Sequence, residues 1–148
     1  MTQRPAYIYT GGSVVMHSPL ALKRASMYGF FLKGQLPQLQ QTVDSALNQV
    51  AASRMEFKVL SPYVMTTFTR IAHANSTTPV DENKGWITEI DIITWVMVGR
   101  LDKAGKVEYV YWYPCHVFVD NAMALINGRE LYGYPKYLCQ YEIPQDGA

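Results

Sequence analysis

The sequence has few charges, and they nearly cancel. Charged residues make up 17 % of the 148 residues, and 13 Lys and Arg face 12 Asp and Glu, for a net charge of +1. A near-neutral chain has no general attraction for nucleic acid or for an anionic membrane surface. We therefore predict that neither is a partner.

Metal ligands and cofactor fingerprints are also scarce. The two cysteines, Cys115 and Cys139, form no Cys-x-x-Cys pair, and His17, His73 and His116 are scattered along the chain. Such spacing gives no zinc or other metal signature. A phosphate-binding loop and a Gly-x-Gly-x-x-Gly fingerprint are missing as well. We predict no metal and no cofactor, and we expect reduced thiols, with a Cys115–Cys139 disulfide as the alternative.

Long apolar runs are the third absence. No run approaches the roughly 20 residues that a membrane-spanning helix needs, and residues 1–9 lack the apolar segment of a secretory signal. Hydrophobic residues still amount to 49 %, which is typical of a folded globular chain. The length suits one domain with a sizeable core. These features predict a cytoplasmic protein with a single domain, residues 1–148.

The residue pattern predicts mainly β-structure. Leu39, Val43 and Leu47 recur at helical spacing and predict one amphipathic helix over 37–52. The turn-forming residues 102–105 predict a hairpin. We expect a short helical turn at 120–127 and strands at 25–33, 55–60, 63–74, 85–101, 106–119 and 138–143. The prediction is an α+β fold built on a curved, mainly antiparallel sheet or barrel, in which the doubly apolar strand 25–33 is covered.

Residues 127–138 contain the most unusual local pattern. Gly128, Gly133 and Pro135 restrict or free the backbone in ways that predict an irregular loop around Lys136. Tyrosines 132, 134 and 137 surround this lysine in the sequence. A lysine in an aromatic and apolar wall is a candidate nucleophile, and the alternative is a surface lysine whose stem lies on the aromatic rings.

A nucleophilic lysine must lose its proton. A free lysine has a pKa of about 10.4, so only about 0.04 % of it is a neutral amine at pH 7. Lowering that pKa to about 7 destabilises the ammonium by roughly 4.6 kcal/mol. Burial in apolar surroundings supplies shifts of this size. The neutral amine can then attack a ketone and form an iminium, which accepts electrons from an adjacent carbon–carbon bond.

The strand predicted at 85–101 carries a second candidate. Alternation places Glu89 and Asp91 on one face, and Ile93 and Trp95 follow on that face. A carboxylate beside large apolar residues is either paired or functional. The alternative is an exposed face at the start of the strand, with both carboxylates in water.

The run Gly128-Arg129-Glu130, followed by Tyr134-Pro135-Lys136, resembles the signature of the acetoacetate decarboxylase family in order and spacing. The resemblance implies that Lys136 is the Schiff-base lysine. It also implies that Glu89, which follows Gly85 after three residues, is an active-site acid that orients substrate or handles protons. It extends over about residues 20–144 and is densest at 120–138.

The same resemblance suggests three substrate-binding residues. Arg24 is the candidate for binding a substrate carboxylate, with a solvated Lys23–Arg24 pair as the alternative. Arg129 and Tyr134 belong to the lysine segment itself. A purely structural role for Arg129, in an ion pair with Glu130 or a hydrogen bond to the loop backbone, stays open.

The implied function is decarboxylation of a small keto acid by a Schiff-base lyase. The sequence departs from the family pattern at Tyr137, where a second lysine is usual, so activation of Lys136 would depend on desolvation and on Arg129. Two alternatives remain. One is aldol condensation and dehydration through the same iminium, and the other is a non-catalytic barrel that binds a ligand.

The family fold implied by the resemblance continues beyond the lysine segment with further strands. Three explanations are open: a fragment, a shortened relative, or a barrel completed by another polypeptide. We accordingly expect a homo-oligomer or a complex with another chain.

Overall fold

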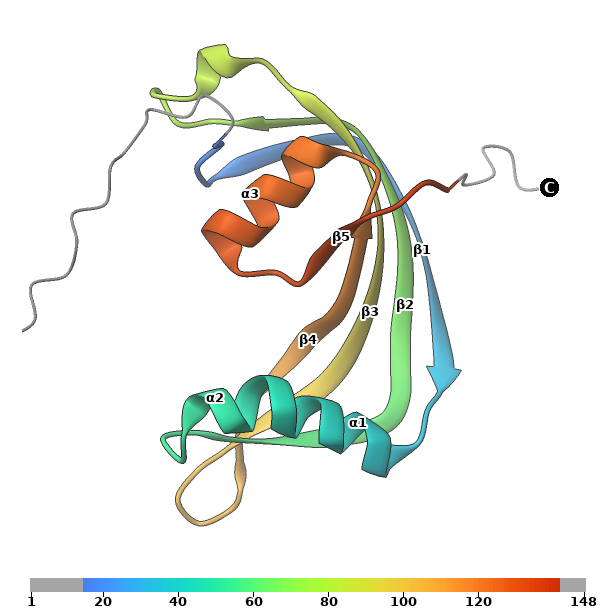
Figure 1. The fold of residues 1–148 in the computed structure, drawn as a ribbon, viewed down its shortest axis with the longest axis vertical. Helices are drawn as coiled ribbons and strands as arrows, with labels where there is room; N and C mark the ends of the chain where they lie inside the picture. The colour runs from blue at the N-terminus through green and yellow to red at the C-terminus, as the bar shows by residue number, and fades with distance from the viewer. Residues whose placement is uncertain (1–14, 142–148) are drawn as a thin grey trace, which may run out of the picture.

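The computed structural model describes residues 15–141. One five-stranded sheet follows the order of the chain, antiparallel from β1 to β4 and parallel between β4 and β5. The strands are β1 (Leu20–Lys33), β2 (Glu56–Ser76), β3 (Ile87–Leu101), β4 (Val107–Val119) and β5 (Lys136–Leu138). Figure 1 shows a strongly curved sheet with the helices on its concave side. The predicted α+β class is confirmed, but the sheet is open and the predicted barrel is not closed.

Two of the four register shifts among the described strands occur at prolines. The register of β2 against β3 shifts between Val59 and Val64, around Pro62. The register of β3 against β4 shifts between Thr94 and Trp95, opposite Pro114. Proline cannot donate a ladder hydrogen bond, and bulges increase local bending and twist. Residues 56–76 are therefore one bent strand, where two extended segments were predicted.

The predicted amphipathic helix is present, with a change of pitch. It consists of α1 (Leu36–Val43), a π-helical turn (Asp44–Asn48) and α2 (Gln49–Ala51). Val43 is fully buried and packs in the main core cluster, whose buried members are Val43, Val59, Val64, Val96 and Val98. Asn48 accepts a hydrogen bond from Phe57 N at 2.7 Å, so the helix also satisfies an edge group of β2.

The C-terminal helix was underestimated. A short turn was predicted at 120–127, but α3 runs over Ala122–Tyr132 and takes in half of the segment predicted as an irregular loop. Glycine inside a helix costs about 1 kcal/mol relative to alanine. Gly128 is tolerated because the helix packs a lysine side chain against it, as described below. The final strand, predicted at 138–143, is instead β5 at Lys136–Leu138: residues 139–141 are not in a strand, and residues 142–143 lie outside the described part of the chain.

The two helical segments lie at opposite ends of the sheet, next to different alternation sets of the strand residues. Val64 pairs with Val96 in the core near α1, whereas Ile71 pairs with Glu89 on the other alternation set. Neighbouring residues in a strand point to opposite faces, and right-handed sheet twist rotates each face along the strand. The twist therefore lets α1 and α3 both lie on the concave side at opposite ends of the sheet (Figure 1).

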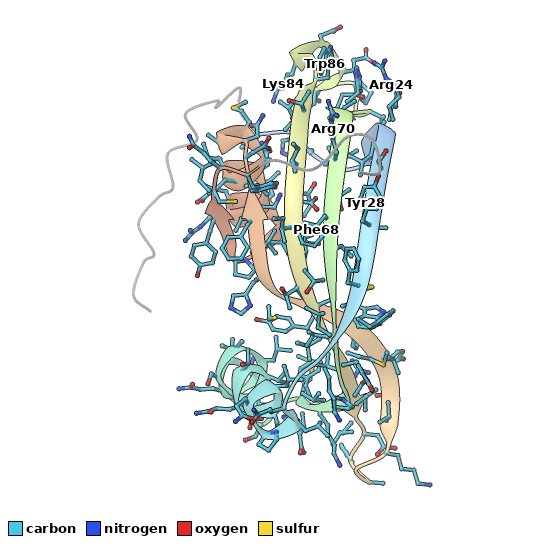
Figure 2. The ribbon with its side chains drawn as sticks, turned by 90° about the vertical axis from the view of Figure 1, so that its right-hand side faces the viewer. Arg24, Tyr28, Phe68, Arg70, Lys84 and Trp86 are labelled. Atoms are coloured by element: carbon cyan, nitrogen blue, oxygen red, sulfur yellow. The ribbon has the colours of Figure 1, made fainter. Side chains whose placement is uncertain are left out.

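The convex side is uncovered over much of β1. Figure 2 shows Tyr28, Phe68 and Arg70 on this side, and Tyr28 pairs with Phe68 across β1 and β2. Phe30 is 54 % exposed and Phe31 64 % exposed. The prediction that 25–33 is covered is wrong for the described part of the chain, because β1 is an edge strand with no layer against it.

Candidate active site

The centre of the site is an ion pair between two segments far apart in the sequence. Lys136 Nζ donates a hydrogen bond to Glu89 Oε1 at 2.8 Å. The lysine side chain is 13 % exposed and the glutamate side chain 12 % exposed. Charged side chains are rarely so buried unless they are paired. The two predicted catalytic residues are therefore in direct contact, at the first residue of β5 and near the start of β3.

The end of α3 directs Lys136 towards Glu89. Gly133 caps the helix with a left-handed φ of 67°. The amide of Tyr134 donates to the carbonyl of Gly128 at 2.9 Å, and the amide of Gly133 donates to that of Arg129 at 3.2 Å. This arrangement is typical of a glycine helix cap that reverses the chain. The chain then enters β5, where Lys136 pairs with Val117 of β4.

Gly128 provides the space that the lysine stem occupies. A Cβ atom added at Gly128 would overlap Lys136 Cδ and Cε. No other residue type can occupy position 128 while Lys136 keeps this path. This contact gives a physical reason for the first glycine of the motif, and sequence spacing alone could not reveal it.

A pair of polar side chains ties β3 to the start of α3. Asp120 Oδ1 accepts a hydrogen bond from Ile90 N at 2.8 Å. Asn121 Nδ2 donates to the carbonyl of Thr88, also at 2.8 Å. The other oxygen of this amide, Asn121 Oδ1, accepts from Met123 N at 2.8 Å and so caps the helix. These bonds flank Glu89 on both sides and hold its strand against the helix that leads to Lys136.

A small cavity of about 130 Å³ lies beside the ion pair. Glu89 and Lys136 supply its charged groups, and most of the remaining lining is apolar. The other lining residues are Met16, Leu20, Leu22, Ala74, Ile87, Ala124, Asn127, Gly128, Tyr132 and Tyr134. A dry apolar cavity of about 150 Å³ can hold a molecule the size of benzene. The space therefore suits a ligand of only a few non-hydrogen atoms.

The segment before β1 closes one side of this cavity and is firmly attached. Met16 N donates to Asn127 Oδ1 at 2.6 Å. The next residue, His17, donates its amide to Asp81 Oδ2 at 2.7 Å, and Lys84 Nζ lies 2.7 Å from Asp81 Oδ1. The His17 amide and the Lys84 ammonium hold the pKa of the buried Asp81 carboxyl well below its usual range.

Asp91 lies two residues along β3 from Glu89, on the same face. It is 9 % exposed, and burial raises the pKa of its carboxyl to about 6. A hydrogen bond with the Thr69 side chain acts in the opposite direction and lowers this pKa. The nearby charge of Glu89 adds to the rise and that of Lys136 opposes it. The predicted alternative, in which both carboxylates face water, does not describe this strand.

The other predicted site residues occupy different places. Tyr134 lines the cavity, and its ring stacks on that of Tyr132 with centroids 6.0 Å apart. Arg129 is exposed and donates from Nη1 to the carbonyl of Lys136 at 3.3 Å, so it supports the backbone of the site. Arg24 is exposed, has a left-handed φ of 52°, and does not line the cavity. Figure 2 shows it near Trp86 at one end of the convex side.

Tyr137, which replaces the second lysine of the motif, points away from the cavity. Lys136 and Tyr137 are neighbours in β5, so their side chains lie on opposite faces. Tyr137 is 52 % exposed, and its ring lies 5.9 Å from that of Phe118. Its hydroxyl therefore does not take the place of a second cation beside Lys136.

Most of the residues that line the cavity could not be identified from sequence patterns. Leu20, Leu22 and Ala74 are ordinary apolar strand residues, and only the pairing of β1 with β2 brings them together. Asn127 is buried and contacts the Met16 amide, which is 111 positions away. A buried asparagine carries no sequence signature, so this contact required the fold.

Two further findings concern the described residues. Cys115 and Cys139 are both free thiols, and burial raises the pKa of each. None of the helices in residues 15–141 is long and apolar enough to cross a membrane.

The family model of acetoacetate decarboxylase matches residues 45–148, which is well over half of the chain and contains both Glu89 and Lys136. The chain belongs to the acetoacetate decarboxylase family. No curated protein matches it at a significant level.

Solved structures support the same fold. An acetoacetate decarboxylase from Legionella pneumophila is 19 % identical, with a TM-score of 0.58 over 95 % of this chain and 44 % of that one. An acetoacetate decarboxylase-like enzyme from Sphingomonas wittichii is 18 % identical, with a TM-score of 0.52 over 77 % of this chain and 39 % of that one. The chain thus spans about two fifths of the length of these structures. At such identities the likeness concerns the fold alone.

Proposed function

We propose that Lys136 forms a Schiff base with a small keto acid and that the chain is a carboxy-lyase of the acetoacetate decarboxylase type. The observation that carries this proposal is the contact of Lys136 Nζ with Glu89 Oε1, at 2.8 Å, beside an apolar cavity of about 130 Å³. Membership of the family supports the same chemistry. The size of the cavity favours a short-chain acid such as acetoacetate.

Glu89 is the base nearest to the amine. In water, moving a proton from an ammonium of pKa about 10.4 to a carboxylate of pKa about 4.3 costs roughly 8 kcal/mol. Loss of water destabilises both ions and so brings the neutral amine–acid pair closer in energy. A substrate that displaces the remaining water would therefore promote proton transfer from Nζ to Oε1. The same carboxyl could return the proton later in the cycle.

The reaction then balances without a cofactor. The amine adds to the ketone carbon, and loss of one water leaves an iminium on Lys136. The carbon–carboxylate bond breaks, its electrons move to the iminium nitrogen, and carbon dioxide leaves an enamine. A proton adds to the enamine carbon, and water hydrolyses the new iminium to release a ketone and free Lys136.

The test is product formation from acetoacetate with the intact chain. We expect carbon dioxide and acetone in equal amounts, and loss of both in Lys136→Arg and Lys136→Met variants. Glu89→Gln should retain a small fraction of the rate, since it keeps the lysine but lacks the base. An equal rate in the wild type and in Lys136→Met would contradict the proposal.

Two other functions use the same cavity. Aldol condensation and dehydration start from the same iminium, and this chain departs from the decarboxylase pattern in having Tyr137 in place of a second lysine. To test for this aldol activity, the protein is supplied with pyruvate and an aldehyde, and the product is analysed for an unsaturated keto acid. Ligand binding without chemistry would give saturable binding of small ketones and no product.

We also propose that a second copy of the chain pairs with the edge of β1. This edge carries exposed apolar side chains along most of its length: Leu22, Met27, Tyr28, Phe30, Phe31 and Leu32 are between 47 % and 67 % exposed. Exposed, apolar edge strands are templates for pairing. Six such residues at about 100 Å² each approach the roughly 800 Å² per partner of a standard interface.

Native mass spectrometry at micromolar concentration tests this assembly. We expect a dimer, and dissociation to monomers in Phe31→Lys. Val80→Lys, at a residue 82 % exposed in the loop after β2, is the matched control and should stay dimeric. A folded wild-type chain that is entirely monomeric would refute the pairing.

The two free thiols are compatible with the cytoplasm that we propose as the location.

A further inference from the structure

Asp91 has a buried oxygen with no hydrogen-bond partner. The residue is 9 % exposed, and within the described residues Asp91 Oδ1 meets no donor. Leaving a buried acceptor unpaired costs on the order of 1–3 kcal/mol. A hydrogen bond with the Thr69 side chain offsets part of that cost, whereas Thr or Val at this strand position would avoid it altogether.

Asp91 lies two residues from Glu89 on the same face of β3, and Glu89 contacts Lys136 directly. Across the sheet it pairs with Thr69 on β2 and Val119 on β4. It does not line the cavity, and Glu89 lies between it and that space in the strand. The titratable groups that act on it are Glu89, Lys136 and Asp120, and its own charge in turn acts on Tyr141.

We propose that Asp91 is a positioning residue whose charge controls the protonation of the Glu89–Lys136 pair, an inference that rests on the Schiff-base function proposed above. An ionised Asp91 attracts the Lys136 ammonium and repels the Glu89 carboxylate. It therefore opposes transfer of the proton from Nζ to Oε1. A protonated Asp91 removes this opposition, so the lysine becomes a nucleophile more easily.

The electrostatic interaction between Asp91 and Lys136 is reciprocal. The lysine charge lowers the pKa of Asp91, so the Asp91 charge must favour the lysine ammonium by the same free energy. The carboxyl titrates near pH 6, where a small change in its surroundings alters its charge. Entry of a keto acid would add another negative charge nearby and favour protonation of Asp91. Substrate binding would thereby remove a negative charge that stabilises the Lys136 ammonium, and so make loss of the lysine proton easier.

The experiment compares the pH dependence of adduct formation between pH 5 and 9. Protein is equilibrated with acetoacetate, reduced with borohydride, and the mass added to Lys136 is quantified. In Asp91→Asn we expect the pH of half-maximal adduct to fall, so that more adduct forms than in the wild type at a fixed pH on the rising side. Asp91→Glu and the exposed control Glu56→Gln should keep the wild-type midpoint. An unchanged midpoint in Asp91→Asn overturns the proposal.

A second measurement separates this inference from the enzymatic function. The NMR titration of the Lys136 side chain, labelled at Cε, needs no substrate. A lower midpoint in Asp91→Asn than in the wild type supports the coupling even if no adduct ever forms, in which case only the Schiff-base function has failed. Equal midpoints overturn the coupling. If Asp91→Asn does not fold, Asp91→Ser removes the same charge and gives the same two outcomes.

Discussion

The stem of Lys136 occupies the space in which a side chain on Gly128 would have to lie. This relationship joins two residues of one motif that are eight positions apart and lie in different elements, α3 and β5. Because Gly128 has no side chain, the lysine stem can pass close to α3 and place its Nζ beside Glu89. The glycine is part of the geometry of the site, although it has no chemistry of its own.

Gly128→Ala should displace Lys136. The added Cβ overlaps the lysine Cδ and Cε, and overpacking of this kind costs about 1–3 kcal/mol, partly offset by about 1 kcal/mol of helix propensity. We expect a modest loss of stability in urea and a large loss of adduct formation at Lys136. Gly29→Ala is the control, since its Cβ would meet Thr67 at an ordinary 3.8 Å. Full adduct formation in Gly128→Ala would contradict the packing argument.

Removing one member of the ion pair should cost more than removing both. Glu89→Gln leaves a lysine that is 13 % exposed without its carboxylate, and breaking a buried pair in this way costs about 3–5 kcal/mol. We expect about 2–3 kcal/mol here, because both groups keep some contact with water. The double variant Glu89→Gln/Lys136→Met should be more stable than Glu89→Gln in urea unfolding at pH 7. Simple additivity of the two single variants would show that the pair is not coupled.

Asp91 should make the protein less stable as the pH rises from 4 to 6. Its pKa is about 6 when folded and about 3.9 when unfolded, so the folded state binds more protons in this window. Stability therefore falls with rising pH, by roughly 3 kcal/mol in total, and stays low above pH 6. Asp91→Asn should remove this component, and urea unfolding at pH 4.5 and 7.5 measures it. A wild type and variant with parallel pH profiles would exclude it.

Asp81 should act in the opposite direction at lower pH. Its pKa is depressed in the folded state by the His17 amide and Lys84, so its contribution is complete above about pH 4 and is lost as the pH falls towards the folded value. We expect Asp81→Asn to be less stable at pH 7 and to lose less stability than the wild type between pH 4 and 2. Circular dichroism during acid titration reports this loss. Equal acid sensitivity of the two proteins would rule out Asp81 as its source.

Local patterns predicted the fold where they act alone. The helical period of Leu39, Val43 and Leu47 predicted the helical segment that the structure has at 36–51. The same rules fail at α3, because Gly128 and Gly133 predict an irregular loop where the structure has a helix and its cap. One glycine is a packing site inside the helix and the other is its cap. Tertiary contacts overrode the local preference, as is common for helix propensity.

The site was predictable only in part. The motif suggested Lys136, and the resemblance to the family suggested Glu89. Alternation alone does not determine whether the face that carries Glu89 is buried or exposed. The Lys136–Glu89 contact spans 47 positions and depends on β5 joining the sheet beside β4. No local rule specifies such a pairing. The exposure of β1 was likewise unforeseeable, since an apolar strand reads alike whether it lies at the edge or in the middle of a sheet.

The most direct test of the account is covalent trapping on one amine. Wild-type protein mixed with acetoacetate and reduced with borohydride should gain the mass of one reduced ketone on the peptide that contains Lys136, at about one per chain. Lys84, which is also ion-paired to a buried carboxylate, should gain none. The absence of any adduct at Lys136 in folded protein, or an equal yield on Lys84, would contradict the central claim.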